Sequence, residues 1–89
     1  MPTANLTIIN RLGLHARAAA KFVQTAAHYG CDVAISKGSK KVNGKSIMGV
    51  MMLAAAQGAE IEICTTGADE QQALDALTAL IADKFGEPS

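Results

Sequence analysis

Polar and apolar residues alternate in three short segments of the chain, the pattern of a β-strand with one buried face. These segments are residues 5–8, 31–36 and 60–63. A tight turn over residues 37–40 follows the second of them, and Lys41 and Val42 are predicted to begin a short return strand. The pattern therefore predicts four strands, each with only one apolar face.

Three other segments have the spacing of helices. Residues 16–28 are rich in alanine, and residues 47–53 form a short apolar segment that Ser46 is suited to cap. Asp69, followed by Gln72, resembles a capping box at the start of a last helix. The apolar face of that helix is predicted to comprise Leu74, Leu77, Leu80, Ile81 and Phe85, before Gly86 and Pro88 end it.

The order of these elements predicts the fold class. Four strands with one apolar face suit an antiparallel sheet whose apolar side is covered by helices. We therefore expect an α+β protein, an open-faced β-sandwich in which three helices cover one face of a four-stranded antiparallel sheet (β-α-β-β-α-β-α). A chain of 89 residues can enclose one core, so residues 1–89 are predicted to form a single domain.

Composition narrows the classes of function. The chain is 49% hydrophobic and 18% charged, with zero net charge, no Trp, one Tyr and two Phe. General nucleic-acid binding is not expected without a basic excess or aromatic stacking residues. No apolar segment approaches the roughly 20 residues of a membrane span, and no signal peptide is recognisable. Cys31 and Cys64 have no metal-ligand spacing, which favours free thiols in a reducing cytoplasm and no metal site.

Charge is distributed unevenly along the chain. Residues 1–46 contain seven basic residues and one acidic residue, whereas residues 47–89 contain one basic residue and seven acidic residues. Pairing of strands from the two halves could interleave these charges and leave no net effect. Alternatively, a basic face steers an acidic partner or a phosphate toward the protein.

His15 is the residue best placed for chemistry. If a helix begins at Ala16, His15 is its N-cap, and unpaired N–H groups of the first turn surround the ring with partial positive charge. The neutral, nucleophilic imidazole is therefore expected near pH 7. A phosphoryl group on the ring would meet these N–H donors and the nearby cation of Arg17.

Two segments together resemble one known family. Gly13-Leu14-His15-Ala16-Arg17 resembles the active-site signature of HPr proteins, the histidine-containing phosphocarriers of the bacterial phosphoenolpyruvate-dependent phosphotransferase system. Lys45-Ser46-Ile47-Met48-Gly49 resembles the regulatory serine segment of the same family. Chain length and element order agree with that family, so the resemblance covers essentially the whole chain.

The resemblance implies a function without a cofactor or metal. His15 would accept a phosphoryl group on Nδ1 from enzyme I and pass it to an enzyme IIA-type protein, with Arg17 stabilising the phosphate. Ser46 would be a substrate of HPr kinase/phosphorylase. The backbone of Ala16, Arg17 and Ala18 is predicted to contact the phosphate, and the docking surface is predicted to include Lys21, Lys45, Ile47, Met48, Met51 and Met52.

One departure from the family and three alternatives bear on this hypothesis. The family usually has proline after the arginine, where this chain has Ala18, so the rate and the lifetime of the phosphorylated state are in question. The chain could serve a regulatory branch rather than sugar uptake. It could also be a stand-alone hydrolase using Ser46 and His15, or a purely binding protein. We expect a monomer, because every docking event needs the same face.

Overall fold

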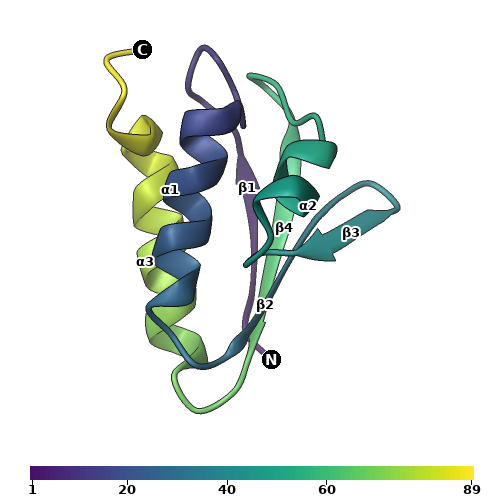
Figure 1. The fold of residues 1–89 in the computed structure, drawn as a ribbon, viewed down its shortest axis with the longest axis vertical. Coiled ribbons are helices and arrows are strands. Elements are labelled where there is room, and N and C mark those ends of the chain that lie inside the picture. The colour runs from purple at the N-terminus through teal and green to yellow at the C-terminus, as the bar shows by residue number, and fades with distance from the viewer.

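The computed structural model describes residues 1–89 and confirms the predicted α+β fold class (Figure 1). Its strands and helices follow one another in the expected order. They are β1 (Thr3–Thr7), α1 (Ala16–Ala27), β2 (Asp32–Lys37), β3 (Lys40–Asn43), α2 (Ile47–Met52), β4 (Glu60–Thr66) and α3 (Glu70–Ala82), followed by a short turn at Lys84–Gly86. None of the helices is long and apolar enough to cross a membrane.

The four strands form one antiparallel sheet in the order β1-β4-β2-β3. Side chains alternate between its two faces, as the sequence pattern predicts. Ile35 is paired with Ile63, and both are buried under the helices. Glu62, the neighbour of Ile63, is exposed on the opposite face. The helices therefore cover one face of the sheet, and the other face carries polar side chains (Figure 1).

One apolar cluster joins the helices to the sheet. Phe22 of α1 and Leu77 of α3 are fully buried and lie on helices that pack side by side (Figure 1). The short helix α2 contributes Val50, with Leu53 beyond its end, which are also buried. Burial of a side chain of this size contributes about 1.5–3 kcal/mol, so this cluster is the main stabilising element of the domain.

The end of α3 differs from the sequence prediction. Phe85 is fully buried as expected, but it does not lie on the helix, which ends at Ala82. Lys84 and Phe85 both have φ of 56°, and Gly86 has φ of 76°, so the chain makes a left-handed turn. The Nζ of Lys21 donates a hydrogen bond to the Phe85 carbonyl in this turn. The turn places Phe85 in the core and redirects the carboxyl-terminal residues toward the start of α1.

The predicted capping box at Asp69 is wrong. Asp69 occupies the N-cap position of α3 but makes no side-chain bond to that helix. Its two carboxylate oxygens instead accept hydrogen bonds from the backbone N–H groups of Gly30 and Cys31, each 2.9 Å long. Glu70 accepts from the N–H of Gly67 at the helix start. Asp69 therefore connects the loop after α1 to the loop before α3.

We expect the Asp69 contact to make stability sensitive to acid. The N–H of Gly30, together with the thiol and N–H of Cys31, holds the pKa of the Asp69 carboxyl below its ordinary value. A lowered folded-state pKa adds stability above the unfolded value of about 4, and this stability is lost as the pH falls through the folded value. Asp69→Asn should therefore lower the free energy of unfolding at pH 7 and flatten its decline in acid. Urea unfolding at several pH values measures this, with Asp32→Asn, an exposed carboxylate without such bonds, as the control.

Four of the seven basic residues in the amino-terminal half bind backbone carbonyls at or just beyond helix ends. The Nζ of Lys45 donates to the carbonyl of Tyr29, which follows α1, at 2.7 Å. Around the end of α2, Lys40 donates to Met52, and Lys37 donates to Leu53 and Ala54. Lys21 provides the fourth contact, beyond α3. Because the last carbonyls of a helix lack partners and carry partial negative charge, the uneven charge distribution has an intramolecular use.

Candidate functional site

The loop before α1 holds His15 at the N-cap position of that helix, as predicted. The N–H of Leu14 donates to the carbonyl of Ala55 at 2.8 Å, and the side chain of Leu14 is buried. Gly13 has a left-handed φ of 67° and packs directly against the backbone of Ala55 and Ala56. These contacts fix the position of the loop against the segment between α2 and β4, and with it the position of the imidazole.

The first turn of α1 presents donors without acceptors. The first helical hydrogen bond runs from the N–H of Ala19 to the carbonyl of His15, at 2.8 Å. The N–H groups of Ala16, Arg17 and Ala18 make no hydrogen bond. Ala18 is fully buried and contributes an N–H that proline at this position would lack. The guanidinium of Arg17 is exposed and also unpaired, so it joins the N–H groups of Ala16 and Arg17 as donors available to an anion beside His15, whereas the N–H of Ala18 is buried.

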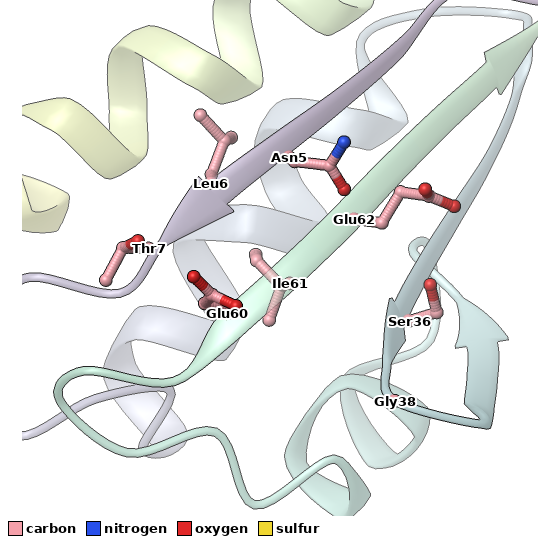
Figure 2. A pocket seen from close by; sticks show the side chains of 8 residues that line it. All are labelled: Asn5, Leu6, Thr7, Ser36, Gly38, Glu60, Ile61 and Glu62. Atoms are coloured by element: carbon pink, nitrogen blue, oxygen red, sulfur yellow. The ribbon is translucent and has the colours of Figure 1, made fainter.

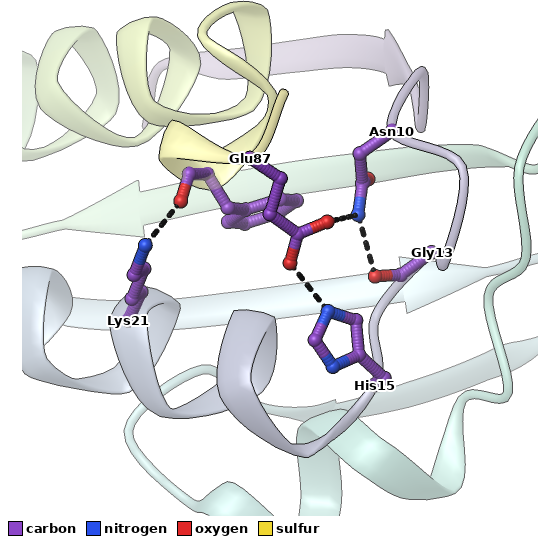
Figure 3. A network of polar contacts seen from close by, with 6 residues as sticks. Asn10, Gly13, His15, Lys21 and Glu87 are labelled. Carbon is purple, nitrogen blue, oxygen red and sulfur yellow. Dashed lines mark hydrogen bonds and ion pairs between the residues drawn. The ribbon is translucent and has the colours of Figure 1, made fainter. Parts of the chain in front are cut away.

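A carboxylate from the carboxyl-terminal segment contacts the opposite side of the ring (Figure 3). One oxygen of Glu87 is paired with Nε2 of His15, and the other accepts a hydrogen bond of 3.0 Å from the amide of Asn10. The same amide donates to the carbonyl of Gly13 at 2.8 Å. Nδ1 of His15 makes no hydrogen bond. The ring therefore has one occupied nitrogen and one free nitrogen.

Sequence reasoning missed both Glu87 and Asn10. Glu87 lies between the two residues that were used only as helix-stop signals, and Asn10 lies in a segment assigned only as a loop. The amide of Asn10 and the ring of His15 hold the pKa of the Glu87 carboxyl below its ordinary value, so Glu87 is ionised near neutral pH. The expectation for His15 considered only the positive end of the helix and did not include this negative charge.

His15 lies in a surface pocket of about 630 Å³. Charged side chains of both signs line it, and the N–H of Arg11 donates to the carbonyl of Ser89 across it at 3.0 Å. The side chain of His15 remains 28% exposed. The lining residues are Arg11, Leu12, His15, Ala16, Arg17, Glu87, Pro88 and Ser89. The pocket thus brings together His15, Ala16 and Arg17 from the predicted site, but neither the buried Ala18 nor Ser46 lines it.

Ser46 caps α2, as predicted. Its Oγ accepts a hydrogen bond of 3.1 Å from the N–H of Gly49, and the residue is partly exposed. The helix that it begins is buried at Val50 but exposes most of its apolar side chains to solvent. Those exposed are Ile47 (44%), Met48 (71%), Met51 (40%) and Met52 (60%), as is Leu12 (66%) in the loop before α1. Only part of this segment therefore packs in the core.

The two lysines assigned to docking are already engaged within the protein. Lys21 binds the turn at Phe85, and Lys45 binds the carbonyl of Tyr29. Both are half-buried. Their side chains are therefore less available to a partner than the guanidinium of Arg17, and their role in docking stays a prediction.

A second hollow, of about 410 Å³, lies on the sheet away from this pocket (Figure 2). Glu62 lies there between Asn5 on β1 and Ser36 on β2, its partners in the strand register. Glu60 is beside Thr7 in the same register. These side chains make no hydrogen bonds with one another, and the two glutamates are exposed, so they belong to a solvated face.

Comparison with known proteins gives one consistent result. Residues 2–83 match the family model described as "PTS HPr component phosphorylation site". The chain is 58% identical over 83 residues to the phosphocarrier protein HPr of Neisseria meningitidis serogroup A, covering 93% of each chain. It superposes on the crystal structure of HPr-C-His from Thermoanaerobacter tengcongensis with a TM-score of 0.97, at 46% identity and full coverage of both chains. A structure described as an HPr dimer from the same organism gives a TM-score of 0.79 at 47% identity, covering 98% of this chain and 100% of that one.

Proposed function

This chain belongs to the HPr family of phosphocarrier proteins of the phosphotransferase system, and from that premise we propose that His15 is its phosphoryl-accepting residue. Phosphorylated enzyme I, charged from phosphoenolpyruvate, donates the group to Nδ1 of His15. An enzyme IIA-type protein then removes it. No cofactor is needed, because the imidazole itself carries the phosphoryl group, bound covalently to Nδ1.

The observation that carries this proposal is the set of unpaired donors beside a free ring nitrogen. Nδ1 of His15 has no hydrogen-bond partner, and the N–H groups of Ala16, Arg17 and Ala18 have no acceptor. Unpaired N–H groups at a helix start bind phosphate oxygens without further side chains. Arg17 adds a cation suited to bidentate contact with those oxygens. A phosphoryl group on Nδ1 would thus be stabilised by groups that are otherwise unsatisfied.

We expect the purified protein to gain the mass of one phosphoryl group when incubated with phosphoenolpyruvate and a bacterial enzyme I. The added mass should be lost in mild acid, because the phosphorus–nitrogen bond is acid-labile. His15→Ala should show no gain, whereas His28→Ala, which removes an exposed histidine just beyond α1, should be phosphorylated like the unmodified protein. Absence of any gain, with a known carrier protein labelled in parallel, would contradict the proposal.

Regulation at Ser46 is a separate proposal based on the family resemblance. Ser46 is partly exposed, and phosphate on its hydroxyl would add about 1.5–2 negative charges at pH 7 beside the exposed apolar side chains of α2. That charge would weaken contact with an acidic partner. With ATP and HPr kinase/phosphorylase, an acid-stable mass gain should occur that is absent in Ser46→Ala. Lack of this gain would exclude this regulation and leave the role of His15 untouched.

We also propose that the working form is a cytoplasmic monomer. The pocket at His15 must be open to enzyme I and then to an acceptor, and a dimer covering it would prevent both contacts. The two cysteines are free thiols, as expected for a reducing compartment. Sedimentation equilibrium tests the oligomeric state, and a stable dimer whose formation protects His15 from phosphorylation would contradict it.

A further inference from the structure

We propose that Glu87 is a positioning residue that selects Nδ1 of His15 as the nitrogen accepting the phosphoryl group, by binding and covering Nε2. This inference rests on the proposed phosphorylation of His15. It concerns the carboxyl-terminal segment, which the sequence signature around His15 does not include. An imidazole has two nitrogens able to form a bond to phosphorus, so a residue that engages one of them directs the chemistry to the other.

Burial and hydrogen bonds hold the side chain of Glu87 in a fixed position. Its side chain is only 9% exposed, although the residue lies close to the chain terminus. Asn10, which is fully buried, donates its amide to one Glu87 oxygen and to the carbonyl of Gly13. Asn10 therefore connects Glu87 to the same loop that positions His15, and the Glu87 carboxylate meets the ring from a fixed direction (Figure 3).

The backbone of the turn just before Glu87 is strained. Lys84 and Phe85 both adopt the left-handed conformation, at φ of 56°, immediately before it. A bulky residue rarely adopts this conformation, and such strain persists only where the surrounding structure enforces it. Burial of the Phe85 ring and the bond from Lys21 enforce it here. Without the left-handed turn the chain after α3 would not reach the start of α1.

The carboxylate determines which nitrogen carries the proton. An ionised carboxylate can only accept, so Nε2 must donate its proton and Nδ1 keeps the lone pair. As that lone pair forms the bond to phosphorus, the bond between phosphorus and the donor's leaving atom breaks, and the leaving group keeps those electrons. The positive charge that develops on the ring is balanced by Glu87. The Nε2 proton stays between the ring and the carboxylate throughout.

Glu87→Gln provides the sharpest test. The NH₂ group of Asn10, which faces this position and is also held by the carbonyl of Gly13, can only donate, so it will bind the carboxamide oxygen and leave the new NH₂ group facing Nε2 of His15. The proton should then move to Nδ1, which inverts the tautomer. Nitrogen-15 NMR of the imidazole should show Nε2–H in the unmodified protein and Nδ1–H in Glu87→Gln. Phosphorylation of Nδ1 should slow by about 100-fold, a smaller loss than the 10⁴-fold of a buried catalytic triad with the wrong tautomer, because His15 is partly exposed.

Glu87→Ala tests the covering of Nε2 separately. With phosphoramidate as the donor, enzyme I is not needed, so changes in partner docking cannot contribute to the result. Nitrogen-15 and phosphorus-31 NMR should then detect only Nδ1-phosphohistidine in the unmodified protein and a mixture of both isomers in Glu87→Ala. Glu60→Gln and Glu60→Ala, which alter an exposed carboxylate on the open face of the sheet, are matched controls and should behave like the unmodified protein.

The outcomes separate this inference from the function it rests on. If the unmodified protein is phosphorylated and both Glu87 variants keep its tautomer and its single isomer, the inference is wrong and the phosphocarrier function stands. If neither enzyme I nor phosphoramidate phosphorylates the unmodified protein, the proposed function fails first. A variant that only loosens the fold would lower the melting temperature without inverting the tautomer, which would also overturn the inference.

Discussion

Gly13→Ala is expected to lower the free energy of unfolding by about 3 kcal/mol. A Cβ at this position would lie 2.5 Å from the carbonyl oxygen of Ala55 and 2.8 Å from the Cα of Ala56. Both are backbone atoms, so neither can move without shifting the loop. The left-handed φ of 67° adds about 1–2 kcal/mol for a residue with a side chain, and overpacking adds about 1–3 kcal/mol.

Gly38→Ala separates these two contributions. Gly38 has a similar φ of 61°, but a Cβ there would meet no atom within 4 Å. Urea unfolding should show a loss of only about 1 kcal/mol for this control. The Gly13 variant should also be phosphorylated more slowly, because the displaced loop carries His15. Equal losses of stability in the two variants would show that the contact with Ala55 and Ala56 is not important.

Phe85→Ala is expected to cost about 3–5 kcal/mol, as removal of a fully buried phenylalanine does in other cores. That is a large part of the roughly 5–15 kcal/mol that stabilises a domain of this kind. Phe85 also anchors the left-handed turn, so the ordered position of Glu87 should be lost with it. The Nε2–H signal of His15 should then exchange rapidly with water in NMR spectra recorded under conditions where the variant is still folded.

Phe85→Leu is the matched variant, because it keeps an apolar side chain in the same site. It should cost no more than about 1.5 kcal/mol and preserve the protected Nε2–H signal. If Phe85→Ala loses stability while the His15 signal stays protected, the turn does not depend on the Phe85 ring. In that case the turn would be held by its own backbone hydrogen bonds, from Gly86 to Asp83 and from Glu87 to Lys84, and by the bond from Lys21 to the Phe85 carbonyl.

Local patterns were sufficient to predict the sheet and the three helices. Alternation of side chains in residues 60–63 requires only that one face of a strand be buried, so Ile61 and Ile63 could be assigned to the core from the sequence. Ser46 and His15 were assigned as N-caps from the residues that follow them. In each case the relevant neighbours lie within a few positions along the chain.

Contacts between distant segments could not be predicted in this way. Glu87 meets His15 across 72 positions, and Asp69 reaches Gly30 across 39, so neither pairing leaves a periodic signal. Phe85 has the right spacing for a helical face, but the turn that buries it depends on what the chain beyond it contacts. The family signature singled out His15 and Arg17 as candidates, whereas the carboxylate partner of His15 required the three-dimensional arrangement.

The two chain termini lie at opposite ends of the molecule (Figure 1). The amino group of Met1 is 3.6 Å from Glu70, the first residue of α3, whereas the segment beyond α3 meets His15 through Glu87. A handle for surface immobilisation or a fluorescent label is therefore best attached ahead of Met1, where it leaves the ring of His15 accessible. The same handle attached after Ser89 would pull on the residues that hold the imidazole in place, and binding assays on such a fusion would report a disturbed site.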